Sequence, residues 1–163
     1  MATTGSNACN TTSDVVMTSV AEFVGQQSVQ DQLLVEAVSR RRSGAKSISA
    51  GLCIMPAGHH SRAHLHEQHE IVIYVLEGRA ATLWGWDLKP TEHGPGDFVY
   101  VPAGTPHVAV NLSERARLLA IEHRTDPEFN TDVTLLPDLY ERAASIAADL
   151  RRRKEPQWTS SSD

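Results

Sequence analysis

Two short segments of the chain carry histidine and carboxylate side chains at spacings that suit a metal site. In the first, His64 and His66 are two residues apart, so their side chains leave the same face of an extended chain. Glu70 lies four residues after His66 and shares that parity on a continuous strand. Two imidazoles and a carboxylate on one face suit a borderline divalent metal such as Fe(II), Mn(II), Ni(II) or Zn(II).

A second segment supplies a fourth candidate ligand. Residues 96–111 read as a strand, a tight turn and a second strand, and His107 shares one face of that second strand with Asn111. If both segments line one lumen, His107 can close on the other three ligands and leave metal positions free for water or substrate. A lone histidine is as readily a core or surface residue. The whole set, however, is costly to bury unless something pairs its polar groups.

The neighbouring polar residues receive less direct roles. His69 has the opposite parity to His66 and is expected to face away from the site. Both His60 and Gln68 have the parity of a ligand, and whether either touches the site stays open.

Aromatic residues nearby are candidates for catalysis and substrate binding. Tyr74 has the predicted lumen parity and is the first candidate for a catalytic proton acceptor, ahead of Tyr100 and Glu70, with a hydrogen-bonded core tyrosine as the alternative. Trp84 and Trp86 share a parity, and they either line a flat pocket for an aromatic substrate or pack the sheet.

The elements that must position these residues are predicted to be mostly strands. Ile48, Leu52 and Ile54 belong to an alternating apolar run, the period of a half-buried strand. Further short β-rich runs follow at 71–78, 79–86, 96–104, 107–111 and 116–123, with Gly and Pro between them. Short strands at this spacing predict an all-β sandwich or barrel.

The chain is predicted to form one domain with extensions. The expected parts are a flexible tail (1–14), an N-terminal extension packing on the barrel (15–45), the β core (46–125), a C-terminal linker and helix (126–155) and a flexible tail (156–163). A short helix is expected at 15–24 and a strand at 31–38. Near the C-terminus, Leu139, Ala143, Ala147 and Leu150 follow a helical period and predict an amphipathic α-helix.

The amino-acid composition limits the kinds of partner that the chain is expected to bind. The 163 residues carry 15 Lys and Arg against 20 Asp and Glu, a net charge of −5, which argues against nucleic acid as a partner. No leader sequence and no long apolar run is visible, so a cytoplasmic protein without a membrane partner is expected. Two cysteines are too few for a disulfide scaffold.

The two segments resemble the cupin superfamily. Its first motif, G-x5-H-x-H-x3/4-E-x6-G, is similar to the run from Gly58 through His64, His66 and Glu70 to Gly78, except that seven residues separate Glu70 from Gly78. Its second motif, G-x5-P-x-G-x2-H-x3-N, is matched at every spacing by Gly96, Pro102, Gly104, His107 and Asn111. The resemblance covers residues 48–125.

The resemblance implies a double-stranded β-helix, or jelly-roll barrel, with a C-terminal α-helix added. It also implies that His64, His66, Glu70 and His107 bind one divalent transition metal per chain (Fe, Mn, Ni or Zn). Asn111 is expected to make a supporting hydrogen bond or to shape a turn. A homodimer is expected as well, because jelly-roll cupins commonly pair through sheet edges.

Three functions remain open at this point. The favoured one is a metal-dependent enzyme acting on a small organic molecule, most plausibly an oxygenase (a dioxygenase-type oxidoreductase). The second is an isomerase, cyclase or lyase that uses the same metal as a Lewis acid. The third is a non-catalytic cupin that binds a metal or small ligand, since a ligand set does not name a reaction.

Overall fold

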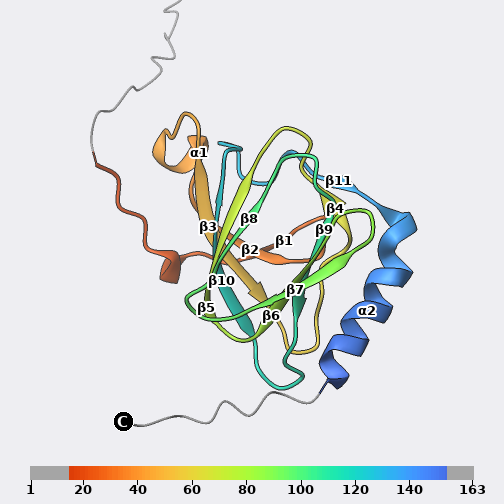
Figure 1. The fold of residues 1–163 in the computed structure, drawn as a ribbon. Coiled ribbons are helices and arrows are strands. Elements are labelled where there is room, and N and C mark those ends of the chain that lie inside the picture. Colours follow the sequence, from red (N-terminus) through yellow and green to blue (C-terminus); the bar gives the residue numbers. More distant parts are fainter. Residues whose placement is uncertain (1–14, 154–163) are drawn as a thin grey trace, which may run out of the picture.

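The computed structural model describes residues 15–153 as two antiparallel β-sheets that face each other, with an α-helix on one flank (Figure 1). The tails expected at 1–14 and 156–163 lie outside the described residues. The larger sheet has the strand order β1-β2-β3-β10-β5-β8, and the smaller has the order β11-β4-β9-β6-β7. This arrangement confirms the predicted all-β fold class.

Both sheets are assembled from strands far apart in the sequence. The larger contains β1 (Gln26–Gln27), β2 (Leu33–Val38), β3 (Ser49–Met55), β5 (Ile71–Glu77), β8 (Phe98–Val101) and β10 (Leu118–Arg124). The smaller contains β4 (His64–Leu65), β6 (Ala80–Trp84), β7 (Lys89–His93), β9 (His107–Asn111) and β11 (Thr134–Leu135). The helices are α1 (Arg40–Ser43), α2 (Tyr140–Arg152) and two one-turn 3-10 helices, Val20–Glu22 and Pro137–Leu139.

Helix α2 covers the outer face of the smaller sheet, and this packing separates the sheet's two faces. Its apolar stripe, predicted from the sequence, buries Ala143, Ala147 and Leu150. They pack in one cluster with Leu83 and Val108 of the sheet. Because these apolar residues alternate with His107 along the strands, the outer face takes the apolar side chains and the inner face receives the imidazole.

The N-terminal prediction was partly wrong. In place of a helix over 15–24, the structure has only the 3-10 turn Val20–Glu22. Met17 and Val24 are each 90% exposed, so the segment lacks the buried apolar face that stabilises a short helix. By contrast, the strand expected at 31–38 is present as β2.

Two further elements were not among those predicted from the sequence. The one-turn helix α1 follows Ser39, whose side chain accepts a hydrogen bond from the backbone N–H of Arg42. Strand β7 contains Pro90, and it is tolerated because β7 lies at the edge of its sheet. No helix within residues 15–153 is long and apolar enough to cross a membrane.

Asn111 ties the end of β9 to two neighbouring loops. Its side chain is fully buried, and its Nδ2 donates to the carbonyls of Pro56 and Ala116, both at 2.9 Å. Its Oδ1 accepts from the backbone N–H of Ser113, also at 2.9 Å. Asn111 therefore fills the turn-shaping role expected for it and fixes the strand that begins at His107.

We predict that Asn111→Ala lowers the free energy of unfolding by about 2–4 kcal/mol, because buried carbonyl and N–H groups lose their partner. Urea denaturation of the metal-free protein measures the change. Ile48→Ala, at a side chain that is 59% exposed, is the control and should stay within about 0.5 kcal/mol of the parent. Equal stability of the two variants would contradict this role.

Candidate metal centre

Three buried histidines lie together on the inner side of the smaller sheet. Strand β4 pairs with β9 so that His64 is the register partner of His107, and His66 follows two residues after His64. One ring nitrogen from each of the three lies within 4.8 Å of the others. The ring centroids of His64 and His107 are 4.2 Å apart, and that of His66 is 5.3 and 5.6 Å from them.

Backbone carbonyls fix the protonation of these rings. His64 Nδ1 donates to the carbonyl of Arg62 at 2.8 Å, and His107 Nδ1 donates to that of Thr105 at 2.9 Å. Because a carbonyl can only accept, the Nε2 of each ring keeps a free lone pair. The Nε2 of His66 is also buried and has no hydrogen-bond partner. Three such nitrogens in one place fit a divalent transition metal.

Burial keeps the rings in the neutral form that a metal requires. It lowers the pKa of His64 well below the usual histidine value and also lowers the pKa of His107. For His66, burial and then the positive charge of Arg124 lower the pKa to about 4. All three imidazoles are therefore uncharged near neutral pH.

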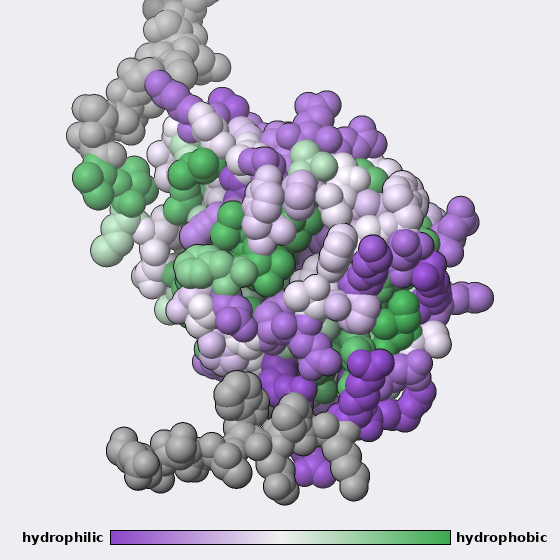
Figure 2. Space-filling view, viewed as in Figure 1, coloured by the Kyte–Doolittle hydropathy of each residue, from purple (hydrophilic) through white to green (hydrophobic). Residues whose placement is uncertain are grey.

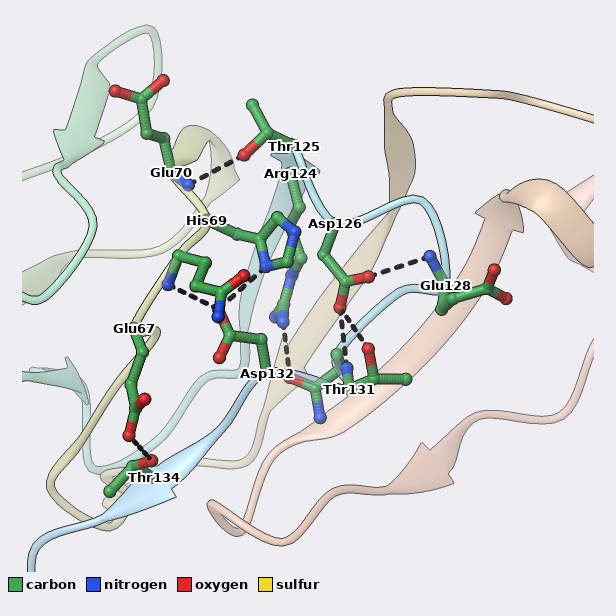
Figure 3. Close-up of polar contacts among 12 residues, drawn as sticks. Glu67, His69, Glu70, Arg124, Thr125, Asp126, Glu128, Thr131, Asp132 and Thr134 are labelled. Carbon is green, nitrogen blue, oxygen red and sulfur yellow. Dashed lines mark hydrogen bonds and ion pairs between the residues drawn. The ribbon is translucent and has the colours of Figure 1, made fainter.

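The structure does not bring Glu70 to the histidine group. Its side chain is exposed, and its carboxylate accepts a hydrogen bond from the hydroxyl of Tyr100 at 2.6 Å. Figure 3 shows this carboxylate pointing away from Asp132 and Arg124. Ile71, the next residue, is buried instead.

The register of β5 explains both this difference and the position of Tyr74. Ile71 and Val75 are its most buried residues, so the inward-facing parity is the opposite of the predicted one. Tyr74 is the register partner of Phe98, their rings are 4.6 Å apart, and Tyr74 is not part of the histidine group. The extra residue between Glu70 and Gly78 displaces Glu70 by one position, and such a slip moves a side chain to the other face.

The remaining polar candidates also lie outside the histidine group. His69, expected to face away, bonds the carboxylate of Asp132 at 2.8 Å through Nδ1. Gln68 is exposed, and its backbone N–H donates to the same carboxylate. His60 forms an isolated β-bridge with Val110 and is not part of the group.

Sequence reasoning missed the loop that supports His66. The backbone of Asp132 acts to raise the pKa of His66, while the Asp132 carboxylate accepts from the backbone of Gln68 and from His69. Figure 3 shows how this loop, between β10 and β11, is tied to the turn after His66. Its signal in the sequence is weak, because residues 125–132 carry no periodic pattern.

A buried ion pair on β10 was missed as well. Glu122 and Arg124 face inward on the same strand, with side chains only 5% and 1% exposed, and they contact each other. Arg124 lowers the pKa of His66 and Glu122 raises it, so their opposite charges act on the histidine group. Arg124 also donates to Asn130, and Asn130 exchanges hydrogen bonds with Gln30. The sequence contained a signal for the pair, because Glu122 and Arg124 lie an even number of residues from the apolar Leu118 and Ala120 and therefore share their face of the strand.

Comparisons with known proteins agree with this geometry. A family model described as "Cupin domain" matches residues 51–122. An uncharacterized protein of Streptomyces coelicolor is 37% identical over 76 residues, which is 47% of this chain and 70% of that protein. A quercetin 2,3-dioxygenase of Bacillus subtilis is 42% identical over 52 residues, 32% of this chain and 15% of the dioxygenase.

A solved structure gives the same fold. A conserved protein with a double-stranded β-helix domain from Klebsiella pneumoniae superposes with a TM-score of 0.57 at 17% identity. The match covers 75% of this chain and 97% of that one.

We predict that replacing His64, His66 or His107 by Ala lowers the bound metal far below one ion per chain, because each removes a third of the nitrogen ligands. Elemental analysis of the purified variants measures the metal content. His69→Ala and Glu70→Gln are matched controls on the same segment and should keep the parent content. A loss in Glu70→Gln as large as in the histidine variants would contradict the ligand set seen here.

Proposed function

The chain belongs to the cupin superfamily, and on that premise we propose that it is a metal-dependent enzyme, an oxygenase, that acts on a small organic molecule. The observation that carries the proposal is the group of three buried histidines whose free nitrogens converge. The local similarity to a quercetin 2,3-dioxygenase supports the oxygenase form, although it spans only 15% of that enzyme.

In this proposal His64, His66 and His107 hold one divalent iron or manganese ion, which supplies the redox chemistry for a reaction with O₂. The chain's contribution is to orient the rings of His64 and His107 through the carbonyls of Arg62 and Thr105 and to exclude water from all three rings by burial. With three neutral protein ligands, a metal that takes five or six ligands keeps room for a substrate.

The proton acceptor proposed from the sequence, Tyr74, is not part of the histidine group, and its ring packs on that of Phe98. The buried carboxylate that acts on the histidines is Glu122, which is paired with Arg124. Glu122 therefore balances charge near the metal centre, and the proton acceptor is left to the substrate or to solvent.

The same ligand group also suits Lewis-acid chemistry, which is the alternative function. A metal such as Zn(II) or Ni(II) on the same nitrogens would polarise a carbonyl without redox change. A non-catalytic binding cupin is the second alternative. Metal identity and oxygen dependence separate the three.

We predict that the protein as isolated carries iron or manganese near one ion per chain, and that its turnover stops when O₂ is removed. Elemental analysis and paired aerobic and anaerobic assays, with quercetin among the compounds tested, measure both quantities. His66→Ala is the inactive control. Zinc as the resident metal, or equal rates without O₂, would contradict the oxygenase and favour the Lewis-acid enzyme.

We also propose a homodimer formed through the sheet edges. The outermost strands are β1 and β8 in the larger sheet and β11 and β7 in the smaller, and an unpaired edge is a template for association. Light scattering should give about twice the chain mass of 17.9 kDa. A mass that stays at the monomer value over a range of concentrations would contradict the dimer.

A further inference from the structure

A cavity of about 880 Å³ opens between the β6–β7 hairpin and the segment 97–106. This volume is in the range of pockets that bury a small organic ligand. The cavity lies beside two edge strands, β8 of the larger sheet and β7 of the smaller sheet. It is therefore a place where the interior between the sheets is reached from outside.

The cavity wall gathers the exposed aromatic side chains of the chain. Four aromatic residues line the cavity and are exposed: Trp84 (42%), Trp86 (63%), Phe98 (72%) and Tyr100 (57%). The other large aromatic residues within 15–153 are less exposed than these four. Figure 2, whose hydropathy colours leave tryptophan and tyrosine pale, shows hydrophobic residues mixed with paler and hydrophilic ones near the middle of the viewed face, in the region where Figure 1 places β8. Leaving rings in water forgoes a large favourable burial, so four of them around one cavity indicate a ligand.

The ring of Trp84 is held in position before any ligand binds. The indole N–H of Trp84 donates to Thr91 Oγ1 at 2.9 Å, and the Thr82 hydroxyl hydrogen-bonds to His93 Nε2 at 2.9 Å. These two pairs satisfy each other, whereas the Nδ1 of His93, also in the wall, is buried and has no hydrogen-bond partner in the described part of the chain. A preorganised wall loses little side-chain freedom on binding.

The charge of the wall disfavours an anion. Its two ionised groups are the carboxylates of Glu92 and Asp97, and the lining contains no Lys or Arg. The carboxylate of Glu92 is partly balanced by Arg79 at 3.3 Å, whereas the Asp97 carboxylate accepts a hydrogen bond from the backbone N–H of Gly94. The Lys89 ammonium lies 5.5 Å from the centroid of Trp84 but is not part of the lining.

The cavity shares a wall with the metal centre. Gly104 and Thr105 line it, and the same two residues bond the ligand segments: Gly104 N–H donates to the carbonyl of His66 at 2.6 Å, and the carbonyl of Thr105 accepts from His107. Trp84 is also the register partner of His107 on the adjacent strand. A molecule seated against Trp84 therefore lies next to the strand that carries His107, while the three histidines themselves are not part of the cavity lining.

We propose that this cavity binds a planar aromatic small molecule without negative charge, and that it is the substrate site of the enzyme. The assignment as a substrate site rests on the proposed function, whereas the binding of an aromatic molecule does not require the metal.

The test uses the full-length protein, both metal-free and loaded with Fe(II). Indole, tryptamine and indole-3-acetate are the probes, because they share one ring system and differ in charge. Binding is followed by calorimetry and, in the metal-free protein, by the ¹H–¹⁵N spectrum. We expect indole and tryptamine to bind and to shift the indole N–H signals of Trp84 and Trp86. The backbone amide of Ala147, in α2 on the opposite side of the smaller sheet, should not shift.

Two variants locate the binding. Trp86→Ala removes an exposed ring and should weaken indole binding by about fivefold or more. Ile48→Ala, at a side chain of similar exposure outside the cavity, should leave the affinity unchanged. We also expect indole-3-acetate to bind at least about fivefold more weakly than tryptamine.

Several results would overturn the proposal. They are no binding of any probe, unchanged affinity in Trp86→Ala, tighter binding of the anion, or light scattering and spectra showing that a second copy of the chain fills the cavity. Loss of metal binding with retained probe binding would instead reject the proposed function and leave the aromatic site in place.

Discussion

Three imidazole nitrogens with free lone pairs lie together inside this protein, and burying such acceptors without partners is unfavourable. The surrounding residues fix the orientation of these nitrogens despite the free-energy cost of burying them. Carbonyls of Arg62 and Thr105 hold the rings of His64 and His107 in one tautomer, and neither carbonyl belongs to a regular strand. The loops that precede β4 and β9 thus determine which nitrogen each of these two rings presents, and the resulting group of nitrogens is compatible with a divalent metal.

The division of apolar and polar side chains between sheet faces follows from the same constraint. Helix α2 and the outer face of the smaller sheet form a core that contains Leu83 and Val108 and needs no contribution from the inner face. Stability and ligand binding can therefore reside on opposite faces of the same strands. The buried pair of Glu122 and Arg124 completes the inner side, where each charge is compensated by the other.

How much could be predicted from the sequence depends on whether the information was local. Alternation along β3, β9 and β10, and the helical period of α2, are local patterns, and the structure has each of these elements. To place His64 and His66 on one face, only the alternation of side chains over two residues was required. To place Glu70 and Tyr74, the alternation of side chains between the two faces had to be continued from His66 through a turn into β5. One additional residue in this segment reverses that alternation. The supporting loop around Asp132 depends on contacts more than 60 residues apart, as between Asp132 and His69, which no local pattern reports.

The loop from Pro102 to Pro106 connects the metal centre with the aromatic cavity. Gly104 has a positive φ of 73°, a conformation that favours glycine, and in it the backbone N–H reaches the carbonyl of His66. The carbonyl of the neighbouring Thr105 holds the ring of His107, and Gly104 and Thr105 both line the cavity. A ligand that displaced this loop would therefore change the positions of two histidines. Binding energies coupled through one element act in both directions, so a metal on the histidines would in turn hold the cavity wall in place. The second motif thus serves the metal centre and the cavity together, which explains why a turn of five residues carries two prolines and a glycine.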